Sequence, residues 1–119
     1  MKRDLLLFIE DISDRINLIE KSTNNLSQKN FSSNQDIIDA TIRRLEIIGE
    51  AVKNVPNSFR EKYPEIEWKK IAGFRDVIIH GYFGINYERV WSIIKDDLPT
   101  LKLQIQKVRD DLERKVKKK

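Results

Sequence analysis

The chain has 119 residues, of which 39% are hydrophobic and 35% are charged, and its formal net charge is +4. That length suits a single domain, residues 1–119, that buries roughly two thirds of its unfolded surface. The absence of cysteine excludes a disulfide framework, a thiolate metal site and a cysteine nucleophile, and the single histidine argues against a zinc site within one chain.

The positive charge is concentrated at the C-terminal end. Five of the 23 Lys and Arg residues lie in residues 114–119, and no acidic residue accompanies them. Without them, residues 1–113 carry 18 basic and 19 acidic side chains, so the body of the chain is nearly neutral. A distributed basic face that would follow a nucleic-acid backbone is therefore not indicated. We interpret residues 114–119 as a basic tail at a solvated helix end rather than as a binding arm.

The N-terminal segment contains an apolar run that is too short and too acidic for a targeting signal. Asp4, Glu10 and Asp11 flank this run, and no cleavage site of small residues follows it. No other segment approaches the length of a membrane span. We therefore expect a cytoplasmic protein that does not enter a membrane.

Apolar residues at helical spacing predict the first two helices. The first is expected from about Lys2 to Ser22, and its stripe consists of Leu5, Phe8, Ile9, Ile12, Ile16 and Ile19. Residues 23–33, which are rich in Asn, Ser and Gln, predict a loop. Ser33 or Asn34 then caps the second helix, whose stripe consists of Ile37, Ile38, Ile42, Leu45, Ile48, Val52 and Val55.

Glycine and proline mark the next boundaries. Gly49 costs helical stability, which indicates that a neighbouring helix approaches closely at that point. Pro56 ends the second helix, residues 57–63 predict a turn or two, and Pro64 suits the first turn of a third helix. The buried side of that third helix is expected to consist of Trp68, Ile71, Ala72, Ile78 and Ile79.

The third helix is expected to end near His80, because Gly81 can adopt the left-handed conformation that terminates helices. Asn86 then caps a fourth helix, which carries Val90, Trp91, Ile94 and Leu98. Pro99 restarts the chain in a fifth helix, whose stripe consists of Leu101, Ile105, Val108, Leu112 and Val116. No segment alternates apolar and polar residues over the length of a strand. The pattern therefore predicts an all-α fold, an antiparallel bundle of four to five helices.

Most of the residues that can do chemistry lie between Phe74 and Trp91, in the segment FRDVIIHGYFGINYERVW. Arg75 and His80 would lie about 140° apart on an uninterrupted helix, but a helix that ends at His80 frees both side chains to reach one cleft. Arginine offers a planar fork of donors to phosphate oxygens, and histidine can transfer a proton near neutral pH. Such a pair could cleave RNA without a metal ion, with the 2′-hydroxyl group as the internal nucleophile.

The same reaction makes a prediction about assembly. It uses both a base and an acid, whereas one chain has one histidine. A symmetric homodimer would bring two copies of Arg75 and His80 into one groove. The mechanism therefore predicts a homodimer.

Each of these residues also has a structural interpretation. A lone histidine at a helix C-terminus, such as His80, is often no more than a capping cation. Glu46 and Glu50 lie one turn apart and can form an acid pair, although solvated or salt-bridged carboxylates are commoner. A place in the core or at an interface fits better than base stacking for the aromatic residues Trp68, Tyr82, Tyr87 and Trp91.

The segment resembles the HEPN superfamily and, within it, the HepT-like toxins of prokaryotic toxin–antitoxin pairs. The family pattern is an arginine followed directly by a polar residue, a histidine a few positions on, and a tyrosine two residues after the histidine. This sequence has Arg75, Asp76, His80 and Tyr82 in that order and spacing. The resemblance extends to the runs LEIIGEAVKNVP, WKKIAGFRD and HGYFGINYERVW, so that about half of the chain matches in amino-acid sequence.

The resemblance implies a HEPN-like helical domain that acts as a metal-independent ribonuclease, needs no cofactor and forms homodimers. Arg75 and His80 from both chains would line a composite cleft for RNA. Asp76 would be a supporting residue that orients Arg75 or His80, or that makes only a local ion pair. The resemblance also implies a partner, a minimal nucleotidyltransferase that acts as the antitoxin and transfers AMP from ATP to Tyr82. The AMP group would add bulk and negative charge at the cleft and so repel RNA.

A second hypothesis belongs to a different class of function. The chain could be a non-catalytic helical module that docks the nucleotidyltransferase or a nucleotide, with the motif as its docking and modification site. The intact motif favours the ribonuclease, whereas the nearly neutral body favours the binding module. Cleavage of RNA by the purified chain is the observation that separates the two.

Overall fold

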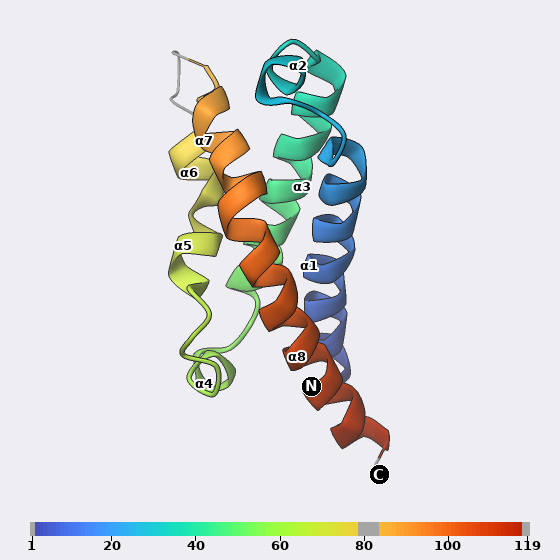
Figure 1. Cartoon of the computed structure of the whole chain (residues 1–119). Coiled ribbons are helices and arrows are strands. Elements are labelled where there is room, and N and C mark those ends of the chain that lie inside the picture. Colours follow the sequence, from blue (N-terminus) through green and yellow to red (C-terminus); the bar gives the residue numbers. More distant parts are fainter. Residues whose placement is uncertain (1, 79–83, 118–119) are drawn as a thin grey trace.

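The computed structural model of the chain describes residues 2–78 and 84–117, and these residues form helices and no β-strand (Figure 1). The elements are α1 (Lys2–Thr23), α2 (Gln28–Ser32), α3 (Gln35–Lys53), α4 (Asn57–Arg60), α5 (Trp68–Ala72), α6 (Phe74–Ile78), α7 (Tyr87–Ser92), a π-helical turn (Ile93–Asp97) and α8 (Leu98–Lys117). The predicted all-α fold is confirmed. None of the described helices is long and apolar enough to cross a membrane.

Three long helical rods make up the body of the bundle. α1 packs antiparallel to α3, and α7, the π-helical turn and α8 follow one another without a break and return along α1 (Figure 1). The beginning of α1 and the end of α8 therefore lie at the same end of the bundle. α5 and α6 cover another side of α3, and α4 lies at the turn of the chain from α3 to α5.

The predicted apolar stripes form the core. Residues with no exposed surface come from each rod, and they include Ile9, Ile12, Ile16 and Ile19 of α1, Leu45, Ile48 and Val52 of α3, and Leu98 and Val108 of α8. Burial of one such side chain contributes about 1.5–3 kcal/mol to folding. The helical periodicity of the sequence thus accounts for the long elements and for the faces that they bury.

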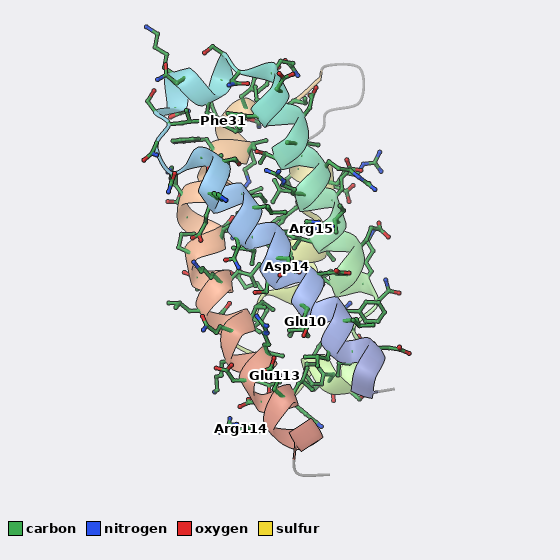
Figure 2. All side chains as sticks on the ribbon, turned by 90° about the vertical axis from the view of Figure 1, so that its right-hand side faces the viewer. Glu10, Asp14, Arg15, Phe31, Glu113 and Arg114 are labelled. Atoms are coloured by element: carbon green, nitrogen blue, oxygen red, sulfur yellow. The ribbon has the colours of Figure 1, made fainter. Side chains whose placement is uncertain are left out.

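The segment between α1 and α3 was predicted to be a loop, and this prediction is wrong in part because it contains α2. The Ser27 hydroxyl group caps α2 by accepting a hydrogen bond from the Asn30 amide at 3.1 Å. Phe31 is fully buried, and its ring centroid lies 5.3 Å from that of Trp91 in α7. Figure 2 shows Phe31 at the end of the bundle opposite Glu113 and Arg114 of α8. Burial of Phe31 against distant helices, together with the Ser27 cap, therefore orders this polar segment.

The third predicted helix is also wrong in its bounds. It was expected to begin at Pro64 and continue to His80, but α5 begins only at Trp68 and the helix divides at Gly73. The Trp68 indole donates a hydrogen bond to the Tyr63 carbonyl at 3.1 Å, which holds the preceding residues in turns. Gly73 has low helix propensity, and the chain turns there between α5 and α6. The predicted helix end at His80 and the left-handed conformation of Gly81 lie outside the described residues.

Pro99 was predicted to restart the chain, yet the helix continues through it. A proline inside a helix removes one backbone donor, and its ring conflicts with the carbonyl group four residues earlier, here that of Lys95. The π-helical turn immediately before α8 accommodates this conflict by wider hydrogen bonding, in which the Leu98 amide donates to the Ile93 carbonyl. The fourth and fifth predicted helices are therefore joined end to end.

Candidate functional site

The candidate site lies where α3 meets α5 and α6. A side chain at Gly49 would place its Cβ atom 3.3 Å from the Ala72 carbonyl oxygen and 3.5 Å from that of Ile71. Only glycine allows the two backbones to approach so closely without a shift. The predicted close approach at Gly49 is confirmed, and it brings the side chains of α6 against those of α3.

Arg75 lies in the first turn of α6 and reaches back to α3. Its Nε atom is 3.8 Å from Oε2 of Glu46, and the two side chains are 66% and 30% exposed, respectively. Asp76, the next residue, is exposed in the same turn, where a carboxylate suits the N-terminal end of a helix. The guanidinium group is thus held at one side and remains open to solvent.

These side chains border a small groove of about 80 Å³ between α3 and α6. Glu46, Arg75 and Asp76 lie at one part of it, and the groove extends along α3 to Glu50 and Lys53, which form an ion pair of 3.6 Å with each other. Both cations and carboxylates therefore line the groove. An open guanidinium group in such a groove can bind one phosphate group through its planar fork of donors.

His80 and Tyr82 lie outside the described residues, so the predicted pairing of Arg75 with His80 stays a prediction. The described residues on either side of that segment are in contact with each other. The Asn86 amide donates a hydrogen bond of 2.8 Å to the carbonyl of Ile78, the last residue of α6. Asn86 also caps α7 as predicted, because its side chain accepts a hydrogen bond from the Arg89 amide at 3.0 Å. The residues that border His80 and Tyr82 in the sequence are thus fixed at the end of α6.

Glu46 is the residue of this region whose contact the sequence analysis missed. An acid pair with Glu50 and the commoner salt-bridged state were both considered for Glu46, but no cation was named as its partner. Each carboxylate pairs with a different cation, Arg75 for Glu46 and Lys53 for Glu50. The sequence did contain a signal. Glu46 lies one helical turn before Gly49, so the face that the glycine opens to a neighbouring helix also carries Glu46.

A second polar cluster joins the segment before α5 to α8. The Tyr63 hydroxyl group donates a hydrogen bond of 2.7 Å to Oδ2 of Asp111. Burial, together with this carboxylate, raises the pKa of Tyr63 to about 12. The hydrogen bond from Tyr63 lowers the pKa of Asp111, and Arg114 adds to this effect. Near neutral pH the pair is a neutral phenol and a carboxylate, which suits a structural contact rather than proton transfer.

Among residues 2–78 and 84–117, no three His, Asp or Glu side chains gather as they would around a bound metal ion. The described part of the site offers an exposed guanidinium group with carboxylates beside it.

Comparison of the sequence with known proteins assigns the chain to a family. A family model described as "Ribonuclease HepT-like" matches residues 12–108. A protein of Methanocaldococcus jannaschii, provisionally named an RNase, is 43% identical over 114 residues, which is 96% of this chain and 94% of that protein. A protein of Thermococcus cleftensis, provisionally named ribonuclease HepT, is 43% identical over 109 residues, which is 92% of this chain and 99% of that protein.

One relative is longer than this chain, and its name gives two activities. The Methanocaldococcus jannaschii protein named gamma-glutamylcyclotransferase and, provisionally, RNase is 41% identical over 114 residues. The match covers 96% of this chain but only 51% of that protein, so the chain spans about half the length of this relative. No solved structure matches the chain.

Proposed function

The chain belongs to the HepT-like ribonuclease family, and from this premise we propose that it is a metal-independent endoribonuclease that acts as the toxin of a toxin–antitoxin pair in the cytoplasm. The observation that carries the proposal is the position of Arg75. Its guanidinium group is open to solvent at the N-terminal end of α6, and the segment that follows α6 contains the only histidine of the chain.

Arg75 and His80 divide the chemistry of RNA cleavage between them. The 2′-oxygen of the RNA attacks the adjacent phosphorus atom, the bond from phosphorus to the 5′-oxygen breaks, and the products are a cyclic 2′,3′-phosphate and a free 5′-hydroxyl group. Arg75 binds the phosphate oxygens and stabilises the charge that develops on them. His80 takes the proton from the 2′-hydroxyl group or donates one to the leaving 5′-oxygen. Asp76 supports the site by orienting one of these two residues.

The need for both a base and an acid supports a homodimer. A chain with one histidine supplies only one of the two groups, whereas a two-fold axis beside the site would place two copies of His80 at the same phosphate. We therefore propose that the catalytic cleft is composed of Arg75 and His80 from both subunits.

Regulation by a minimal nucleotidyltransferase completes the proposal. The Tyr82 oxygen attacks the α-phosphorus of ATP, pyrophosphate leaves, and the tyrosine retains AMP. Tyr82 lies two residues after His80 in the sequence, so the added phosphate brings negative charge close to the proposed cleft. The modified toxin would then repel RNA.

The test is cleavage of single-stranded RNA by the purified, unmodified chain in excess EDTA. We expect fragments with cyclic phosphate ends, and a loss of about 100-fold or more for both Arg75→Ala and His80→Ala, since each removes a group that acts on the transition state. Arg114→Ala is the matched control, because Arg114 is an arginine of similar exposure on α8 (72%, against 66% for Arg75). It should cleave RNA like the parent.

Two results would overturn the ribonuclease proposal. One is equal inactivity of the parent and both variants on varied RNAs, with the intact mass excluding prior modification. The other is full activity of Arg75→Ala with an unchanged melting temperature. In the first case, the alternative of a non-catalytic module that docks a nucleotidyltransferase or a nucleotide becomes the better account.

A further inference from the structure

We propose that Glu46 is a positioning residue for Arg75, an inference that rests on the proposed ribonuclease function. The contact is specific in its geometry. Oε2 of Glu46 lies 3.8 Å from Nε, the inner nitrogen of the guanidinium group. Within residues 2–78 and 84–117, Arg75 forms an ion pair with no carboxylate except that of Glu46, and its side chain is 66% exposed. The carboxylate therefore holds one edge of the guanidinium plane and leaves the outer pair of donors for a phosphate group.

Glu46 is the more fixed member of the pair. It lies in the middle of α3, a helix of 19 residues, and its side chain is 30% exposed, whereas Arg75 is 66% exposed on a helix of five residues. The backbones of α3 and α5 approach closely at Gly49, one turn further along α3, and α6 follows α5 directly and packs on α3 beside Glu46. The orientation of a long, flexible side chain is thus set by a carboxylate on a rigid element.

The same contact contributes little to the stability of the fold. Exposed ion pairs are weak because water screens them and because two side chains lose rotamer freedom. At 3.8 Å the two atoms are also beyond the range of a direct hydrogen bond. Replacement of Glu46 should therefore leave the melting temperature unchanged, and any effect on RNA cleavage can be assigned to the position of Arg75.

Positioning predicts a particular division between kcat and KM. Glutamine in place of Glu46 removes a negative charge from the groove, so binding of the polyanionic RNA is not weakened and KM should stay the same or fall. The guanidinium group loses its fixed orientation, so the reacting phosphate is stabilised less well and kcat should fall roughly tenfold.

The chain offers a matched control on the same helix. Glu50 lies one turn after Glu46, and its cation is Lys53 rather than Arg75. Glu50→Gln removes the same charge from the same groove without touching the contact to Arg75. A comparison of the two variants separates the effect of that contact from the general effect of charge.

The experiment measures steady-state RNA cleavage, as kcat and KM, and the melting temperature of each protein. The proteins are the parent, Glu46→Gln, Glu46→Asp, Glu50→Gln, Arg75→Ala and the double variant Glu46→Gln with Arg75→Ala. We expect Glu46→Gln to lose roughly tenfold in kcat with no rise in KM, and Glu46→Asp to recover part of the loss. Glu50→Gln should share any fall in KM that the lost charge causes but should keep the kcat of the parent. In the Arg75→Ala background, Glu46→Gln should cause no further loss, because the two residues act as one unit.

The possible failures are distinguishable. If Arg75→Ala abolishes cleavage but Glu46→Gln behaves like Glu50→Gln, the positioning role is wrong while the ribonuclease proposal survives. If Glu46→Gln is more active than Glu50→Gln, Glu46 competes with RNA for Arg75 and the inference is overturned. If the parent is inert, or Arg75→Ala is fully active, the proposed function itself has failed and the positioning role falls with it.

Discussion

At the scale of single residues, Tyr63 shows how burial and one carboxylate control a titration. In the unfolded chain a tyrosine releases its proton near pH 10, whereas the pKa of folded Tyr63 is about 12. Between these values the folded state holds more protons than the unfolded state, so the free energy of unfolding falls as the pH rises. For Asp111 the pKa is lowered instead, so its contribution is present above about pH 3.8 and is lost as the pH falls through the folded value.

Replacement of Tyr63 by phenylalanine tests this contact. Tyr63→Phe should be less stable than the parent at pH 7, and the difference should shrink between pH 10 and pH 12, because only the parent loses stability there through Tyr63. Its stability should also fall less at low pH, since the largest cause of the lowered Asp111 pKa is removed. Urea unfolding at several pH values measures both trends. A difference between the two proteins that stays constant from pH 9 to pH 12 would contradict the assignment.

At the scale of elements, the approach of α3 to α5 decides where α6 lies. The contact at Gly49 is with backbone oxygen, which cannot rotate away as a side chain can. Gly73, at the junction of α5 and α6, differs from Gly49 because it has no such close contact. A Cβ atom there would be 3.5 Å from the nearest atom, an ordinary van der Waals contact, and its φ of −95° is open to any residue. The two glycines of this region are therefore not equivalent.

The difference between the glycines can be measured by substitution. Gly49→Val should lower the free energy of unfolding by about 2 kcal/mol or more, because a branched side chain must push α5 away from α3. It should also reduce RNA cleavage, since α6 moves with α5 and the contact between Arg75 and Glu46 lengthens. Gly73→Ala is the control and should change stability by less than about 1 kcal/mol. Chemical denaturation and the cleavage assay give both quantities, and equal effects at the two positions would refute the close-contact explanation.

At the scale of the whole molecule, the proposed composite cleft requires two chains. If Arg75 and His80 act from both subunits, a heterodimer of Arg75→Ala and His80→Ala chains keeps one copy of each residue at the axis. A homodimer of either variant lacks one of the two residues altogether. We expect co-expressed chains with two different tags, purified as heterodimers, to cleave RNA measurably faster than either variant alone.

The matched control is a mixture of the two variant homodimers under conditions in which they do not exchange subunits. That mixture should show only the sum of the two residual activities. A purified heterodimer that also shows no more than this sum would mean that each chain contains its own site, and the composite cleft would be wrong. A chain that stays monomeric at assay concentrations would contradict it too.

The sequence by itself determined the elements whose signals are local. The apolar stripes of α1, α3 and α8 follow from the helical period, and the caps Asn34 and Asn86 act on amides only three residues away. Gly49 was identifiable because a glycine in mid-helix needs a reason in packing. Arg75 and Asp76 were recognised from their motif and lie on α6, and their roles in catalysis stay predictions. His80 and Tyr82 stay predictions from that motif.

Only the tertiary structure decided the features that depend on residues distant in the chain. α2 is held by the burial of Phe31, whose ring packs on Trp91, and α5 begins where the Trp68 indole donates a hydrogen bond to the Tyr63 carbonyl. Glu46 finds Arg75 only after α6 has packed on α3. Periodicity and capping depend on residues a few positions apart in the chain, whereas these contacts form only when whole helices pack together. The sequence motif identified the Arg75 guanidinium group of the proposed site, whereas its contact with the Glu46 carboxylate depends on the packing of α6 against α3.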